Sequence, residues 1–249
     1  MDANATVERQ EKTVFEKYST PISVLLGALV IGGAIYWNDG NPRAENPTVP
    51  QGPSQAELGK MLENVSPVTA ADHVRGNPNA EVVIVEYSDT ECPFCKRFHE
   101  TMKQVIGEYG ENGKVAWVYR HFPLDQLHEK ARSEAVALEC ANEQGGNDAF
   151  WKYADRLFEI TPSNDGLEAA ELPKIATFVG LDATKFTTCL SSGKYDAHIE
   201  AEAQNAIATG GEGTPWSIIV TKSGKKYPLS GAQPYEAVKQ AIEQALAGK

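Results

Sequence analysis

The sequence predicts an α/β domain with an inserted block of helices, preceded by one transmembrane helix. Three observations predict it: an uncharged apolar run near the N-terminus, two strand-like runs that flank a helix, and a return to strands after a long helical stretch. The chain has 249 residues, 41% of them hydrophobic, which suffices for one well-packed domain with appendages. A net charge of -11 with scattered basic residues argues against nucleic acid as a partner.

The first expected element is a membrane anchor at residues 21–37. Its core, Ile22 to Trp37, carries no charge and ends in an aromatic pair, whereas residues 1–20 contain basic side chains. A cleaved signal peptide is the alternative, but the apolar run exceeds a usual signal core and no A-x-A-like site follows it. We therefore expect a single-pass protein of the bacterial cytoplasmic membrane, bound to the lipid bilayer by this helix. Its tail at 1–20 would be cytoplasmic, and its folded domain would lie in the periplasm or at the cell exterior.

The anchor is followed by an expected tether at residues 38–65, where prolines stand among Asn, Gly and Gln. A short helix from Ser54 to Leu62 is expected within it, because Ser54 and Glu57 have the spacing of a capping box. The folded domain is expected at 66–249.

A strand–helix–strand unit opens the folded domain. Val82 to Tyr87 is largely β-branched, which is typical of a strand covered on both faces. Pro93 suits the first turn of a helix that runs to about Tyr109, and Lys114 to Arg120 is a second strand.

Between residues 124 and 209 the pattern changes to helices separated by glycine and proline stops. The expected helices are Leu127–Glu143, Asp148–Glu159, Pro173–Val179, Ala183–Leu190 and Tyr195–Ala208. Two strands follow at 216–221 and 225–230, and a helix at 234–246 closes the chain. This order is that of a thioredoxin fold, a mixed β-sheet flanked by helices, with an inserted helical domain.

A Cys-x-x-Cys motif, Cys92-Pro93-Phe94-Cys95, stands at the start of the first helix. Helix N-termini lower the pKa of a cysteine thiol, because unpaired N–H groups and the helix dipole stabilise the thiolate. Cys92 occupies that position and is the expected nucleophile. Cys95, one turn further in, is the expected resolving thiol of a redox disulfide.

A zinc half-site and an inert disulfide are the alternative interpretations of this motif. Zinc needs about four ligands, and His99 is the only additional candidate at helical spacing, so we expect no metal site and no cofactor. An inert disulfide is the stronger alternative, but a Cys-x-x-Cys between a buried strand and a helix favours redox chemistry.

Glu86 lies in an apolar strand, six residues before Cys92. A buried carboxylate there would either raise its pKa or transfer protons, and the alternative is a strand-edge glutamate in solvent. Cys140 and Cys189 are expected to form a structural disulfide, with two buried free thiols as the alternative.

Val68 to Leu246 resembles the DsbA-like family, in its branch of thioredoxin-like disulfide interchange domains. The resemblance rests on the stretches VVIVEYSDTECPFCKRF, VYRHFPL, ALECANEQGG, FWKYADRLFE, FTTCLSSGKY, GTPWSIIV and SGAQPYEAV. It implies a thiol-disulfide oxidoreductase with Cys92 as nucleophile, Cys95 as resolver and Glu86 as the buried acid. It also implies Pro215 as the cis-proline, so that Thr214-Pro215 and the Pro93-Phe94 dipeptide would contact substrate.

The resemblance implies oxidation, isomerisation or reduction of thiols in exported protein substrates. The first hypothesis is an oxidase recycled by a membrane partner of the DsbB or vitamin K epoxide reductase kind. The second is an isomerase or reductase fed by a membrane reductant transporter. A third is a non-catalytic binding module or chaperone. The Pro93-Phe94 dipeptide differs from the Pro-His of the strongly oxidising enterobacterial type, and this leaves the strength of oxidation open. Thr214 is closer to the residue that isomerase-like members carry before the proline, and this leaves the direction open.

Overall fold

The computed structural model describes residues 53–248, and within them the predicted thioredoxin fold is confirmed. The anchor expected at 21–37 lies outside the described residues. Among residues 53–248, none of the helices has the length and apolar character needed to cross a bilayer.

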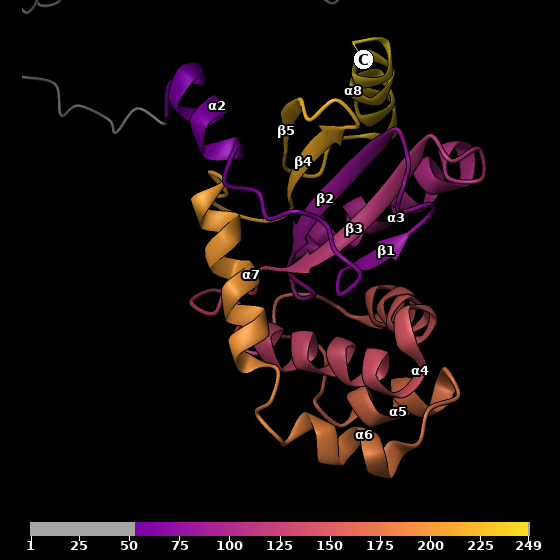
Figure 1. Cartoon of the computed structure of the whole chain (residues 1–249). Helices are drawn as coiled ribbons and strands as arrows, with labels where there is room; N and C mark the ends of the chain where they lie inside the picture. Colours follow the sequence, from indigo (N-terminus) through magenta and orange to yellow (C-terminus); the bar gives the residue numbers. More distant parts are fainter. Residues whose placement is uncertain (1–52, 249) are drawn as a thin grey trace, which may run out of the picture. The chain divides into compact units, whose positions relative to one another are not determined.

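A five-stranded mixed sheet forms the centre of the described chain, in the order β1-β3-β2-β4-β5 (Figure 1). The strands are β1 (His73–Arg75), β2 (Val82–Ser88), β3 (Val115–His121), β4 (Trp216–Thr221) and β5 (Lys226–Ser230). Only the β2–β3 pair is parallel, so the carboxyl ends of these two strands meet at the same edge of the sheet.

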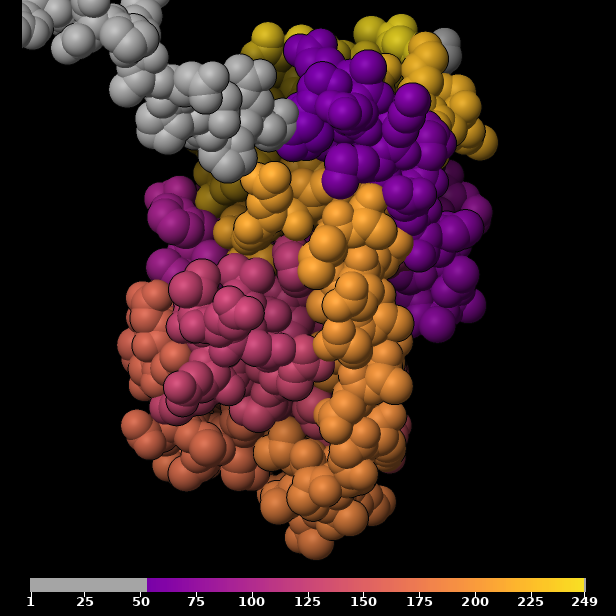
Figure 2. Space-filling view, turned by 90° about the vertical axis from the view of Figure 1, so that its left-hand side faces the viewer, coloured from indigo at the N-terminus to yellow at the C-terminus, as the bar shows by residue number. Residues whose placement is uncertain are grey.

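Helices cover the two faces of the sheet and form the insertion. They are α2 (Gln55–Leu62), α3 (Pro93–Tyr109), α4 (Ala131–Ile160), α5 (Glu171–Phe178), α6 (Ala183–Leu190), α7 (Asp196–Ala208) and α8 (Tyr235–Ala247). One core cluster joins α3, α4 and α8 to one face of the sheet, and a second joins α7 and α2 to the other. In Figures 1 and 2, α7 runs from the inserted helices to the sheet.

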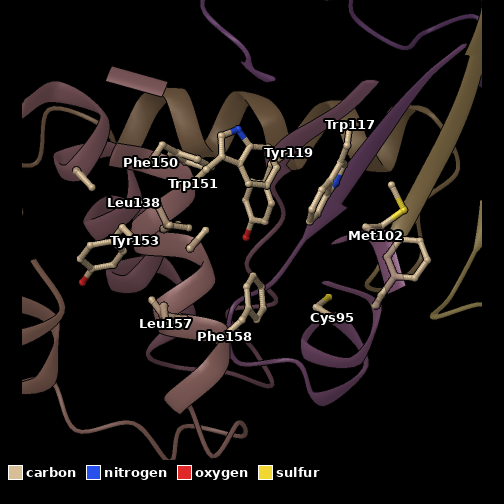
Figure 3. Close-up of a cluster of buried hydrophobic side chains, with 14 of the residues drawn as sticks. Cys95, Met102, Trp117, Tyr119, Leu138, Phe150, Trp151, Tyr153, Leu157 and Phe158 are labelled. Carbon is tan, nitrogen blue, oxygen red and sulfur yellow. The ribbon is translucent and has the colours of Figure 1, made fainter. Parts of the chain in front are cut away.

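The larger core cluster owes its size to aromatic residues from β3 and α4. The rings of Trp117 and Trp151 lie 4.6 Å apart, and those of Tyr119 and Phe150 lie 5.5 Å apart. Figure 3 shows these rings between the insertion and the sheet, with Cys95 in the same cluster. Aromatic pairs of this kind each stabilise a core by about 0.5–1.5 kcal/mol beyond their buried area. The resolving thiol therefore stands in a rigid, dry setting.

Three features differ from the sequence-based expectations. The strand β1 was missed, because three residues are too few to show an alternating pattern. The two helices expected at 127–143 and 148–159 form one element, α4, with a break at Gly146, whose φ of 67° ends regular helix. The expected tether at 38–65 is too long, because α2 belongs to the folded unit: Leu62 is buried in the second core cluster.

Candidate active site

Cys92 is the N-cap residue of α3, and Pro93 occupies the first turn, where its missing N–H needs no partner. Cys95 is fully buried one turn further along, and both thiols are free. The two sulfurs therefore have different surroundings: that of Cys92 lies at the N-terminus of α3, and that of Cys95 lies within the core.

The pKa values of the two thiols move in opposite directions. A hydrogen bond from Cys95 is the largest effect on Cys92 and lowers its pKa to about 6, although burial opposes the change. Burial raises the pKa of Cys95 well above its ordinary value, and the neighbouring Cys92 adds to this. At neutral pH, Cys92 is therefore the thiolate and Cys95 the thiol, the assignment that nucleophile and resolver require.

The segment before β4 lies against Cys92. The Thr214–Pro215 peptide bond is cis, and the Cys92 Sγ lies 3.5 Å from the carbonyl oxygen of Thr214. The Thr214 side chain also helps to lower the pKa of Cys92. Phe94, by contrast, is 53% exposed. A backbone segment and an apolar ring therefore border the reactive sulfur.

Glu86 is buried in β2, at only 1% exposure, so the solvent-facing alternative is wrong. Because side chains alternate along a strand, Glu86 shares one face of the sheet with Ile84, and Val85 and Tyr87 point to the other face. Burial raises its pKa to about 7, while Trp117, which donates to its Oε2 at 2.8 Å, limits the rise. Its negative charge also raises the pKa of Cys95. Glu86 can therefore both hold and release a proton near neutral pH next to the resolving thiol.

A buried Asp–His pair was missed by sequence reasoning. Asp89 lies in the loop after β2, and its Oδ2 accepts hydrogen bonds from His128 Nδ1 at 2.9 Å and from the Leu124 N–H at 2.8 Å. Its own backbone N–H points to the Cys95 Sγ at 3.4 Å. The two residues meet because their loops leave the adjacent parallel strands β2 and β3 at the same edge of the sheet.

A buried pair of acidic residues, Glu91 and Glu134, includes the residue that directly precedes Cys92 in the chain. Glu91 is fully buried and its Oε2 accepts the Asp165 N–H at 2.6 Å. Burial and a hydrogen bond with Glu91 raise the pKa of Glu134, on α4, to about 9, so that this carboxyl keeps its proton at neutral pH. The pair connects the loop before Cys92 to the insertion, and sequence reasoning missed it too.

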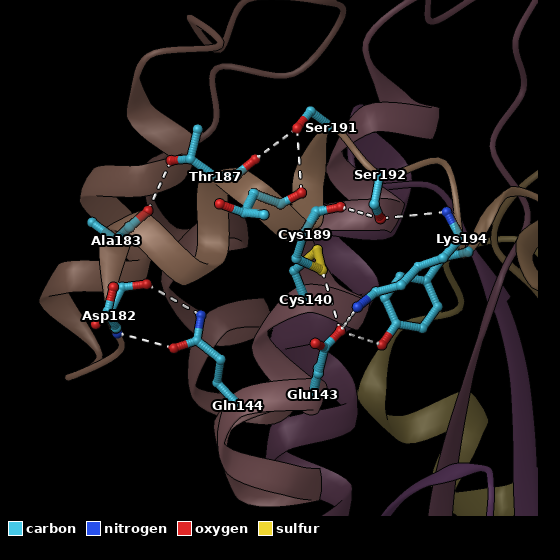
Figure 4. The surroundings of a disulfide bond; sticks show 12 residues. Cys140, Glu143, Gln144, Asp182, Ala183, Thr187, Cys189, Ser191, Ser192 and Lys194 are labelled. Atoms are coloured by element: carbon cyan, nitrogen blue, oxygen red, sulfur yellow. Dashed lines mark hydrogen bonds and ion pairs between the residues drawn. A yellow bond between two sulfur atoms is a disulfide. The ribbon is translucent and has the colours of Figure 1, made fainter.

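The other two cysteines form a disulfide, as the sequence predicts. Cys140 of α4 and Cys189 of α6 are 49 residues apart in sequence (Figure 4). Beside the bond, the Gln144 side chain both donates to the Asp182 carbonyl and accepts its N–H. These contacts join two helices of the insertion and leave Cys92 and Cys95 as the only free thiols in residues 53–248.

The fold places a cysteine at a helix start, a buried partner thiol and a buried acid in one region of the chain, an arrangement suited to thiol–disulfide exchange. The chain belongs to the Thioredoxin family, whose sequence pattern matches residues 68–244.

Solved structures of DsbA type are similar to the chain. Pseudomonas aeruginosa DsbA2 is 29% identical and superposes with a TM-score of 0.60 over 72% of this chain and 96% of its own. Bacillus subtilis BdbD in its oxidised form is 20% identical and superposes with a TM-score of 0.64 over 73% of this chain and 96% of its own. Wolbachia pipientis alpha-DsbA1 is 21% identical and superposes with a TM-score of 0.64 over 76% of this chain and 96% of its own. At these last two identities the likeness is one of fold.

The curated relatives that the chain resembles are named as Na(+)/H(+) antiporters. The Na(+)/H(+) antiporter NhaA 1 of Mycolicibacterium gilvum is 33% identical over 170 residues, and that of Mycolicibacterium vanbaalenii is 34% identical over 181 residues. These matches cover 68% and 72% of this chain but 25% and 28% of the antiporters. The chain thus spans about a quarter of their length.

Proposed function

We propose that the chain introduces disulfide bonds into exported proteins, with Cys92 as the sulfur that forms the mixed disulfide with substrate and Cys95 as the resolving one. The observation that carries this proposal is the opposed ionisation of the two thiols, with the pKa of Cys92 lowered to about 6 and that of Cys95 raised. A stabilised thiolate favours the reduced enzyme, and a couple whose reduced form is stabilised is a strong oxidant.

The reaction balances in two exchanges. A substrate thiolate attacks the Cys92 sulfur of the Cys92–Cys95 disulfide, forming a mixed disulfide and releasing Cys95, which takes up a proton. A second substrate thiolate then attacks the substrate's own sulfur in the mixed disulfide, so that Cys92 leaves as a thiolate. The substrate loses two electrons and the enzyme gains them. Glu86, with its pKa near 7, supplies the proton to Cys95 and takes it back on reoxidation.

The surroundings of Cys92 suit an extended, apolar substrate segment. The Thr214 carbonyl lies beside the sulfur, and the exposed Phe94 ring offers an apolar contact next to it. Backbone recognition by Thr214-Pro215, with apolar contact by Pro93-Phe94, is compatible with many different sequences.

Export and anchoring are part of the proposal. Support comes from the uncharged run Ile22 to Trp37 and from the Cys140–Cys189 disulfide, since structural disulfides persist in oxidising compartments. The domain would then be held outside the cytoplasmic membrane and reoxidised by a membrane partner of the DsbB or vitamin K epoxide reductase kind. A reporter enzyme active only outside the membrane, fused after Lys249, should be active; activity of a cytoplasmic reporter instead would refute this part.

The reduction potential of the Cys92–Cys95 couple tests the direction. We expect it to be clearly more oxidising than the value of about -270 mV typical of thioredoxin, as measured against glutathione buffers. A value at or below that figure would show that the chain acts as a reductant.

A further inference from the structure

Three of the chain's five histidines surround one buried carboxylate outside the active site. Glu139, on α4, is 3% exposed. Its Oε1 lies 2.7 Å from His73 Nε2, 2.9 Å from His121 Nε2 and 3.6 Å from His198 Nε2. The four side chains come from β1, β3, α4 and α7, four separate parts of the fold.

Hydrogen bonding alone explains only part of this arrangement. Two imidazole N–H donors satisfy the two lone pairs of a carboxylate oxygen, yet a third imidazole nitrogen faces the same atom. Moreover, the Nδ1 atom of His121 is buried without a partner in the described chain. The cluster therefore contains more nitrogen ligands than the neutralisation of one carboxylate requires.

The spacing of these atoms suits a metal ion. Zinc bonds of about 2.0–2.2 Å to nitrogen and oxygen place tetrahedral ligand atoms about 3.3 Å apart. The ligand atoms of His73, His121 and Glu139 all lie within 4.8 Å of one another, and His198 is at 3.6 Å from Glu139. Coordination would lengthen the 2.7 and 2.9 Å contacts of Glu139 and shorten its 3.6 Å contact, so that all three approach the tetrahedral spacing.

The surroundings also provide support and access. The His73 ring stacks on Phe150 at 3.6 Å between centroids, which fixes its plane. Glu202 accepts the His121 backbone N–H at 2.7 Å and lies 3.5 Å from His198 Nε2, so a second carboxylate faces the cluster. The His198 side chain is 40% exposed and borders a surface hollow with Asp72, through which an ion could enter.

We propose that His73, His121, His198 and Glu139 bind one Zn²⁺ ion in a closed, structural site. Imidazole nitrogens outnumber oxygens in this set, which favours zinc over calcium or magnesium. Since the ligands come from both the sheet and the inserted helices, the ion would hold α4 and α7 against the edge formed by β1 and β3. Motif spacing could not reveal the site, because its ligands are scattered from residue 73 to residue 198 of the sequence.

Zinc titration of the purified full chain tests the site. The Cys92→Ser/Cys95→Ser background is used, because the active-site dithiol could otherwise bind zinc itself. Calorimetry with ZnCl₂ should give one ion per chain, and the melting temperature should rise with zinc. CoCl₂ should give the visible bands of a four-coordinate nitrogen and oxygen site.

Two ligand variants and one matched control make the result decisive. Glu139→Gln and His198→Gln should each weaken zinc binding by at least about 10- to 100-fold, while Glu200→Gln, an exposed acid also on α7, should bind zinc like the parent. If circular dichroism shows that Glu139→Gln does not fold, the partly exposed His198→Gln decides alone. Absence of zinc binding by the parent, or undiminished binding by the folded ligand variants, would overturn the proposal.

Discussion

At the scale of single residues, position in the fold alone gives the identical thiols of Cys92 and Cys95 different pKa values. Cys92 caps a helix and Cys95 is enclosed by the core, so the same thiol group is acidified in one place and kept protonated in the other. Glu86 belongs to the same dry region, and its raised pKa suits the proton transfer that we propose for Cys95.

The pH dependence of stability tests the burial of Glu86. Its pKa rises from 4.5 in a solvated chain to about 7 in the fold, so the folded state binds the proton more tightly. Its contribution is therefore most favourable below pH 4.5 and is lost as the pH rises through 7, a difference of up to about 3 kcal/mol. The Glu86→Gln variant should be stabilised relative to the parent more at pH 8 than at pH 5, in urea unfolding of the reduced proteins.

The same variant tests the proton role. Exchange with a model disulfide should be slower in Glu86→Gln and should lose the component of its pH profile that titrates near 7. Superimposable rate profiles for variant and parent would show that Glu86 is a bystander and that water carries the proton.

Residues with a conspicuous chemistry or a local motif could be predicted from the sequence, whereas Asp89 and His128 could not. Cys92 and Cys95 share a four-residue motif, and Glu86 is conspicuous as a charge in an apolar strand. Asp89 and His128, by contrast, are 39 residues apart, and neither looks unusual alone. Their role depends on the pairing of two strands, which no local pattern reveals.

At the scale of elements, the site depends on the parallel pair β2 and β3. The loops that leave these strands bring Asp89 to His128, and the Asp89 backbone to Cys95. Burial opposes the charged form of His128, but the Asp89 carboxylate outweighs it and raises the His128 pKa; Cys92 contributes in the same direction. Because such coupling is mutual, protonated His128 must favour the Cys92 thiolate.

Removal of His128 should therefore raise the pKa of Cys92. We expect His128→Asn to shift the ultraviolet titration of the thiolate to higher pH, and to cost about 1–3 kcal/mol of stability, because Asp89 loses a buried partner. The control is His198→Gln, whose ring faces Glu139 instead. Equal titration curves for parent and His128→Asn would refute the electrostatic link.

Helices and strands with a long sequence pattern were predicted well. Those whose place in the fold depends on tertiary contacts were predicted poorly. The bounds of β4 and α6 agree with those expected from the sequence, since both have strong patterns between clear stops. The short strand β1 forms because it pairs with β3 at the edge of the sheet. Helix α2 belongs to the fold because Leu62 packs in the second core cluster. Neither reason is visible in the local sequence.

At the scale of the whole molecule, the described chain combines a sheet and a helix that hold Cys92 and Cys95 with an inserted helical block that the Cys140–Cys189 disulfide stabilises. Because Cys140 and Cys189 close a loop over a separation of 49 residues, their bond should stabilise the fold by about 4 kcal/mol on the chain-entropy account. The Cys140→Ala/Cys189→Ala variant should therefore unfold at lower urea. Its Cys92 exchange rate under native conditions should match the parent's, and a large loss of rate would show that the bond also shapes the site.

The most direct test of the central claim is the capture of mixed disulfides. In the Cys95→Ser variant the resolving thiol is gone, so the Cys92 thiolate should attack disulfide-bearing substrate proteins and accumulate covalent adducts with them, visible on non-reducing gels and removed by a reductant. The Cys92→Ser variant, in which the buried Cys95 remains, should give none. Absence of adducts from Cys95→Ser, or equal adducts from both variants, would contradict the assignment of Cys92 as the attacking thiolate.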